Sequence, residues 1–231
     1  MLKKYDELPE FMKNKKVKEY YDILKKKKFQ LLIKRLFDVF CSSILLILLL
    51  PILLILAILI KIDSKGPVFY RQTRITKYGR EFGIFKFRTM VINADKLGSL
   101  VTINNDPRIT RIGRKIRKCR LDELPQVINI LIGDMSFVGT RPEVKKYVDC
   151  YNDEMIATLL MPAGVTSKAS IEYKNEDEII EKYVKKGEKI DNIYVKRILP
   201  EKMKYNLEYI KNFNILTDVK LCIKTIIGVI K

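Results

Sequence analysis

The sequence predicts an α+β protein, mostly helical, that is attached to a membrane by one apolar helix. Three observations carry this prediction. An uncharged stretch of mostly Leu and Ile occupies residues 39–60, and two runs with β character follow it at residues 68–72 and 82–89. From residue 106 onwards the apolar residues recur with helical spacing among many arginines and lysines. We therefore expect one membrane helix, a small β-hairpin and several amphipathic helices.

Charge and composition exclude several classes of function. The formal net charge of +18 in 231 residues indicates an anionic partner: nucleic acid, an anionic membrane surface or phosphorylated substrates. The chain has no histidine, which excludes Ser-His-Asp and Cys-His catalysis and the commonest zinc ligand. Its 4 cysteines include no Cys-x-x-Cys pair, so a zinc site or a thioredoxin-like motif is not supported, and scattered thiols are typical of an intracellular protein.

We divide the chain into three parts. Residues 1–30 form a lysine-rich extension, residues 31–62 form the membrane-embedded helix, and residues 63–231 form a polar domain that ends in helices. The extension has two interpretations. It is either a helix on an anionic bilayer surface, where each basic residue contributes roughly 1 kcal/mol, or a solvated and partly disordered segment.

The apolar stretch at residues 39–60 has the length of a membrane helix, because about 20 helical residues match a hydrocarbon core of roughly 30 Å. Pro51 lies near its middle and removes a backbone hydrogen bond, which kinks or breaks a helix. Lysines and arginines flank both ends, and the positive-inside tendency places both flanks on the cytoplasmic side. On these grounds a re-entrant helix broken at Pro51 and a kinked spanning helix are equally supported.

The second β-like run alternates cations and aromatic rings. In a strand, Lys86 and Arg88 would share one face and the two phenylalanines between residues 84 and 88 the other. Such a surface suits either single-stranded nucleic acid or a phosphate site above an aromatic core. Residues 106–120 then predict a basic helix with a narrow apolar stripe at Ile109, Ile112 and Ile116, which favours an interfacial or substrate-facing role.

Two adjacent carboxylates, Asp122 and Glu123, follow this basic helix. Positive groups that hold a phosphorylated substrate, together with an acid that attacks it or holds a metal ion, suit chemistry on phosphate. The structural alternative is that Asp122 caps a helix in which Pro125 occupies the first turn. The two interpretations are compatible, because a helix N-terminus also stabilises a carboxylate and a neighbouring phosphate.

At these residues the sequence resembles the bacterial sugar transferases, the small monotopic polyprenyl-phosphate glycosyl-1-phosphate transferases. The resemblance runs from about residue 34 to residue 142 and is weaker beyond. Each matching motif is weak alone, but their order and spacing are specific. The motifs are KRLFD (34–38), GPVF (66–69), KFRTM (86–90), LDELPQ (121–126) and GDMSFVG (133–139).

The resemblance implies a monotopic protein whose re-entrant membrane helix is broken at Pro51, with its catalytic domain on the cytoplasmic face of the bacterial inner membrane. It implies transfer of a sugar-1-phosphate from a UDP-sugar to polyprenyl (undecaprenyl) phosphate, with release of UMP, as a first membrane step of glycan assembly. Asp122 would be the nucleophile that forms a phosphosugar-aspartyl intermediate. Mg²⁺ would be the cofactor, and Asp122 and Glu123 would hold it.

The same resemblance places basic residues at the substrate phosphates: Lys86, Arg88, Arg117 and Arg141. Arginine suits two-point binding of phosphate oxygens, so lysine is not a neutral replacement for it. The bilayer, downstream glycosyltransferases and a second copy of the chain are the expected partners; nucleic acid is not among them.

The chain departs from the family at three places. Leu50 precedes Pro51 where family members commonly have serine, and Thr140 replaces a proline before Arg141. Met161 stands where many members have arginine, so sugar specificity cannot be transferred from the family. Two alternatives stay open at this stage. One is a non-catalytic, membrane-anchored protein that binds anionic lipid or nucleic acid, and the other is an enzyme in which Asp122 only holds metal for direct transfer.

Overall fold

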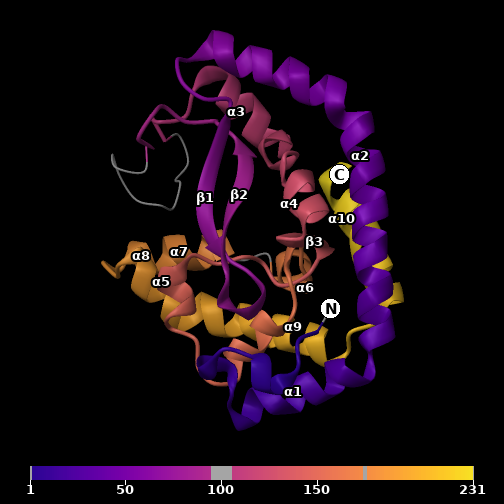
Figure 1. Cartoon of the computed structure of the whole chain (residues 1–231). Helices are drawn as coiled ribbons and strands as arrows, with labels where there is room; N and C mark the ends of the chain where they lie inside the picture. The colour runs from indigo at the N-terminus through magenta and orange to yellow at the C-terminus, as the bar shows by residue number, and fades with distance from the viewer. Residues whose placement is uncertain (1, 95–105, 174–175, 231) are drawn as a thin grey trace.

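One long helix arches over the rest of the molecule in the computed structural model, which describes residues 2–94, 106–173 and 176–230 (Figure 1). This helix is α2 (Lys28–Asp63), with 36 residues. Most of the apolar side chains of this helix are exposed at the surface of the protein. It is long and apolar enough to cross a membrane by length and composition, and 17% of its most apolar window is buried.

The predicted break at Pro51 is not seen, because α2 continues through Pro51 without interruption. A proline deletes one hydrogen bond and leaves the rest of a helix intact, so a bend replaces the break. Figure 1 shows the bend: one end of the helix runs down the side of the molecule and the other end crosses its top. Ser42 and Ser43 also bond the carbonyl of Val39 within the helix, a pattern that bends helices further.

The remaining elements lie inside this arch. The hairpin consists of β1 (Phe69–Ile75) and β2 (Glu81–Phe87), antiparallel, with Phe69 opposite Phe87. A second, parallel pair joins β3 (Met135–Val138) to β4 (Ala163–Thr166). The helices that surround them are α3 (Arg111–Lys118), α4 (Gln126–Ile132), α5 (Lys145–Val148), α6 (Lys168–Glu172), α7 (Glu176–Val184), α8 (Ile190–Ile193), α9 (Leu199–Lys211) and α10 (Ile215–Ile230).

The sequence predicts the hairpin and the basic helix correctly within a few residues, but it misses the second sheet. Strands β3 and β4 have only 4 residues each, which is too short for an alternating pattern to stand out. Thr110 caps α3 by accepting a bond from the Gly113 amide. Ile116 of its apolar stripe is buried against Leu56 and Ile60 of α2 and Phe87 of β2.

The N-terminal extension is folded, so its interpretation as a disordered segment is wrong. Helix α1 (Lys15–Lys26) is capped by Asn14, and its buried side chains include Val17, Tyr20 and Leu24. These side chains join a core with α9 and the turn at Met155–Leu160, while the lysines of α1 remain at the surface. Burial of three large apolar side chains, at roughly 1.5–3 kcal/mol each, offsets the entropy of ordering this segment.

Both ends of α2 dock on the same body of the protein. Near its start, Lys34 pairs with Asp218 of α10 at 2.5 Å, and Arg35 donates to the carbonyl oxygens of Ile130 and Leu131 at the end of α4. Asp218 lies within the first turn of α10 and accepts bonds from Lys34 and Tyr209. Near the end of α2, Asp63 accepts a bond from the Ile112 amide of α3 at 2.9 Å.

Candidate active site

The hairpin and the turn after α3 bring a lysine and a glutamate together. Lys86 lies on β2, and its Nζ is 2.8 Å from Oε1 of Glu123. Both side chains are 23% exposed, so the pair is neither on the surface nor sealed in the core. Asn129 of α4 fixes the strand beside it, since its Oδ1 accepts from the Phe85 amide and its Nδ2 donates to the Gly83 carbonyl.

Asp122 and Glu123 lie on a tight turn, the 3₁₀ segment Leu121–Glu123. The turn is possible because Arg120 adopts a left-handed conformation, with φ 53°, which reverses the chain directly after α3. The interpretation of Asp122 as a helix cap is wrong: α4 begins at Gln126, its N-cap position is Pro125, and no side chain caps it. The carboxylate of Asp122 is therefore not used to start the helix.

The surroundings shift the pKa values of the two carboxyl groups in opposite directions. Burial and the adjacent Glu123 charge raise the pKa of Asp122, against the opposing effect of Lys86 and Arg117. Burial also acts to raise the pKa of Glu123, but Lys86 and Arg141 outweigh it and the pKa of Glu123 is lowered. Glu123 is therefore the ionised carboxylate that pairs with Lys86, and Asp122 is the more basic of the two. Such a difference is typical of two carboxyl groups with distinct chemical roles.

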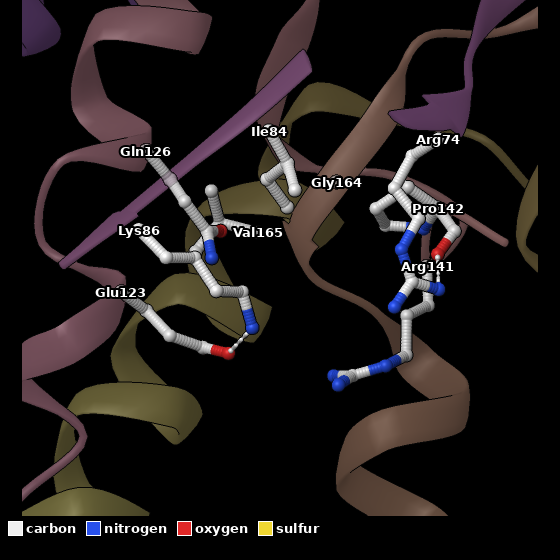
Figure 2. Close-up of a pocket in the computed structure, with 9 residues that line it drawn as sticks. All are labelled: Arg74, Ile84, Lys86, Glu123, Gln126, Arg141, Pro142, Gly164 and Val165. Carbon is white, nitrogen blue, oxygen red and sulfur yellow. Dashed lines mark hydrogen bonds and ion pairs between the residues drawn. The ribbon is translucent and has the colours of Figure 1, made fainter. Parts of the chain in front are cut away.

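Arg141 reaches the same place from the loop that leaves β3. Figure 2 shows its guanidinium extending towards the Lys86–Glu123 pair from the opposite side of a small cavity. Close backbone packing fixes this loop, because a Cβ added at Gly139 would lie 2.4 Å from the Pro162 carbonyl oxygen. Only glycine permits this approach.

A second and larger cavity adjoins the first. Its volume is about 390 Å³, and it contains Asp122 and Arg117. Lys86 and Arg74 line both cavities. The structure thus brings together Lys86, Arg117, Arg141, Asp122 and Glu123, which the sequence predicts as site residues.

Arg88 is oriented differently from the other predicted phosphate ligands. Its guanidinium donates to the carbonyl oxygens of Lys65 and Ser64 and to the Ser64 hydroxyl, at the end of α2. The side chain is buried, although it also contributes to the wall of the larger cavity. These contacts tie Arg88 to the two residues that directly follow α2, and its predicted contact with a substrate phosphate stays a prediction.

Two residues of the site escape sequence reasoning. Arg74 of β1 donates to the Pro142 carbonyl at 3.3 Å and to the Gln72 side chain, and Gln126 of α4 lines the smaller cavity. The alternation along β1 could have indicated that Arg74 shares one strand face with Gln72, two residues earlier. Both side chains line the larger cavity. The sequence alone gives no reason to bring that face to residue 142.

The residues of the site fit a magnesium ion that is shared with substrate phosphates. Mg²⁺ is usually held by one or two carboxylates together with phosphate oxygens and water, and Asp122 and Glu123 supply two adjacent carboxylates. Within residues 2–94, 106–173 and 176–230, no group of three or more acidic or cysteine side chains could hold a metal ion without such help. The donor set therefore suits an ion that completes its coordination with oxygens from outside the protein.

This fold and this site define a class: proteins with a long apolar helix and a carboxylate pair set among basic side chains. The profile of the bacterial sugar transferase family matches residues 29–231. The chain belongs to that family.

Curated relatives agree with the family. The chain is similar to a UDP-N-acetylgalactosamine-undecaprenyl-phosphate N-acetylgalactosaminephosphotransferase of Aeromonas hydrophila, 37% identical over 84% of this chain and 43% of the relative. It is also similar to a UDP-glucose:undecaprenyl-phosphate glucose-1-phosphate transferase of Escherichia coli, 34% identical over 84% of this chain and 39% of the relative. The exopolysaccharide production protein ExoY of Rhizobium meliloti is 33% identical, over 84% of this chain and 83% of its own length.

The match to the first two relatives is partial, since the chain spans about two fifths of their length. Both are named as transferases that act with undecaprenyl phosphate, although the sugar in their names differs.

Proposed function

We propose that this protein transfers a sugar-1-phosphate from a UDP-sugar to polyprenyl phosphate, releasing UMP, in the assembly of a bacterial glycan. One observation carries the proposal: the partly buried Asp122, whose carboxylate pairs with no side chain of the described residues, lies beside the paired Lys86 and Glu123. A carboxylate with a raised pKa is a better nucleophile than an ordinary one once it is ionised. The names of the relatives supply the substrate classes.

The first half-reaction uses Asp122 as the nucleophile. A carboxylate oxygen of Asp122 attacks the phosphorus that bears the sugar, the bond from that phosphorus to the bridging oxygen breaks, and UMP leaves with the electron pair. Arg117 acts electrostatically on Asp122 and Arg141 on Glu123, and both arginines would offset the negative charge of the diphosphate. Mg²⁺ held by Asp122 and Glu123 would supply further neutralisation of that charge when it is bound.

The second half-reaction restores the enzyme. A phosphate oxygen of polyprenyl phosphate attacks the same phosphorus, the bond from phosphorus to the Asp122 oxygen breaks, and the carboxylate is free again. Splitting the transfer into two displacements means that two anionic substrates need not meet directly in the site. Lys86 holds Glu123 ionised and adds positive charge to both cavities.

The docking of α2 supports a re-entrant, monotopic attachment. Lys34 and Arg35 bind the domain near the start of the helix and Asp63 binds it near the end, so both ends belong on the same side of the bilayer. A helix that crosses the membrane would separate its ends by roughly 30 Å of hydrocarbon. The basic flanks place that side in the cytoplasm, which is the face of the inner membrane where the domain would work.

Accessibility to a membrane-impermeant maleimide tests this topology. In a variant free of native cysteines, Lys28→Cys and Lys65→Cys should both be protected in intact cells and both react after lysis. Reaction of either residue in intact cells would show a spanning helix and refute the monotopic proposal.

The reaction is tested with purified protein in detergent, Mg²⁺, undecaprenyl phosphate and a panel of UDP-sugars. Wild type should release UMP with one of them, Asp122→Asn should not, and Asp149→Asn should act as wild type. Asp149 is a suitable control because it is exposed and forms an exposed ion pair with Lys145.

A labelled donor without acceptor should leave a sugar-phosphate on the wild-type protein that is absent from Asp122→Asn. UMP release that needs the acceptor, with no labelled protein, would support direct transfer instead. No UMP release from folded wild-type protein with any donor would leave the non-catalytic, lipid-binding alternative, and full UMP release by Asp122→Asn would refute the role of Asp122.

A further inference from the structure

The loop that presents Arg141 is anchored immediately after that arginine. Arg141 is exposed, but Pro142 and Glu143 are buried. Strand β1 holds this part of the loop from one side: the Ile75 amide donates to the Glu143 carbonyl at 2.9 Å, and Arg74 donates to the Pro142 carbonyl. Figure 2 shows Arg74 and Pro142 beside the base of Arg141.

The side chain of Glu143 is held from the opposite side by the C-terminal helices. The hydroxyl of Tyr194 donates to its carboxylate at 2.5 Å, and both residues are buried. Lys202 of α9 donates to the Tyr194 hydroxyl at 3.3 Å and pairs with Glu176 of α7 at 2.7 Å. A chain of buried polar contacts therefore links α7 and α9 to the residue two positions after Arg141.

The backbone around Tyr194 is unusual in a way that fits this link. Tyr194–Ile198 form a single π-helical turn between α8 and α9. Such turns are rare, and they occur frequently at functional sites. Stacking fixes the ring of Tyr194, since the ring of Tyr147 lies over it with centroids 4.4 Å apart. The hydroxyl thus has little freedom to leave Glu143.

We propose that Glu143 and Tyr194 are positioning residues for Arg141, and that they set the affinity of the site for the diphosphate of the sugar nucleotide. The inference rests on the proposed function only in taking a sugar nucleotide as the ligand. Neither residue lines the smaller cavity, so both act through the loop. If the Glu143 carboxylate loses the hydrogen bond from Tyr194, it must find another donor or change its position. A change in the position of Glu143 moves Arg141, and small displacements of a group that binds substrate are costly.

Nucleotide binding is the measurement that separates positioning from general stability. We would measure binding of UDP-sugar to the Asp122→Asn protein, which needs no turnover, and KM and kcat in the active protein. Tyr194→Phe keeps the stacked ring but removes the hydroxyl; it should weaken binding and raise KM by about three- to tenfold, with kcat changed less than twofold. Glu143→Ala should do the same, and Glu143→Gln, which keeps an oxygen for Tyr194, should be intermediate.

Tyr147→Phe is the matched control. It also removes a phenol hydroxyl from the stacked pair, but that hydroxyl bonds Asp191 at 2.8 Å and not the Arg141 loop. It should match wild type in nucleotide binding. Equal effects of the two tyrosine variants on binding, or wild-type binding by Tyr194→Phe and Glu143→Ala, would overturn the proposal.

Arg141→Ala separates this inference from the reaction. It should weaken binding at least as much as Tyr194→Phe, and a neutral Arg141→Ala would also overturn the positioning role. Absence of UMP release with every donor would count against the proposed transfer, while the order of binding affinities would still decide the role of Glu143 and Tyr194.

Discussion

Replacing Lys34 by methionine should loosen the attachment of the long helix to the domain. Lys34 is 4% exposed, and its Nζ donates to Asp218 at 2.5 Å and to the Val138 carbonyl at 2.8 Å. Asp218 is 2% exposed and also accepts from Tyr209. Methionine matches the length of the lysine stem, so the substitution removes the charge and both hydrogen bonds without opening a large cavity.

The expected cost follows from the burial of the pair. Removing one partner of a buried ion pair leaves an uncompensated charge, which costs about 3–5 kcal/mol. For a chain of this size, 1 kcal/mol shifts the melting temperature by roughly 2–4 °C, so Lys34→Met should lower Tm by roughly 6–20 °C. Adding Asp218→Leu removes the stranded carboxylate, and the double variant should regain part of the loss.

Thermal unfolding in one fixed detergent measures these shifts. Lys145→Met is the control, because Lys145 forms an exposed pair with Asp149 at 2.7 Å and such pairs contribute about 0–1 kcal/mol. A Tm for Lys34→Met equal to that of the control would refute the reasoning. Strictly additive losses in the double variant would show that the two charges do not depend on each other.

Three further predictions concern the site and its supports. The acid limb of the pH profile of kcat should lie above the ordinary range of an aspartate, because burial raises the pKa of Asp122 and its protonated form cannot attack. Lys86→Ala removes a positive charge that lowers this pKa, so the limb should move to higher pH; a shift to lower pH would contradict the assignment. Arg88→Met should lower Tm by roughly 6 °C or more, from loss of several charged hydrogen bonds, whereas Arg141→Ala should leave Tm within about 2 °C and weaken donor binding; the reverse pattern would return Arg88 to the substrate. Gly164→Ala should reduce both stability and activity, because its Cβ would lie 2.1 Å from a backbone nitrogen of the loop leaving β3, and a wild-type Tm would show that this approach is not needed.

Local sequence determines the elements whose residue pattern runs without a gap along the chain, which are the apolar helix and the hairpin. An uncharged stretch can only be a helix in contact with lipid or core, and alternation and turn residues predict the hairpin because neighbours in sequence are neighbours in space. The acidic pair and its basic surroundings are likewise adjacent in sequence, so Asp122, Glu123 and Arg117 can be proposed as a site before any fold is known.

Long-range pairing decides the rest. Nothing local brings Arg74 to residue 142, ties Arg88 to the end of α2 or joins two strands of 4 residues across the chain. The N-terminal extension is a similar case: its lysines dominate the sequence, but Val17 and Leu24 lie on the face that α9 and its neighbours cover.

The sequence by itself determined that this protein has a long apolar helix, an adjacent carboxylate pair among basic residues and membership of the bacterial sugar transferase family. The tertiary structure decided that Arg141 extends into the smaller cavity while Arg88 binds the residues that follow α2, and it placed both ends of α2 against the same domain. The physical reason is that side-chain chemistry is encoded residue by residue, while the direction of each side chain depends on contacts between residues that are distant in the chain.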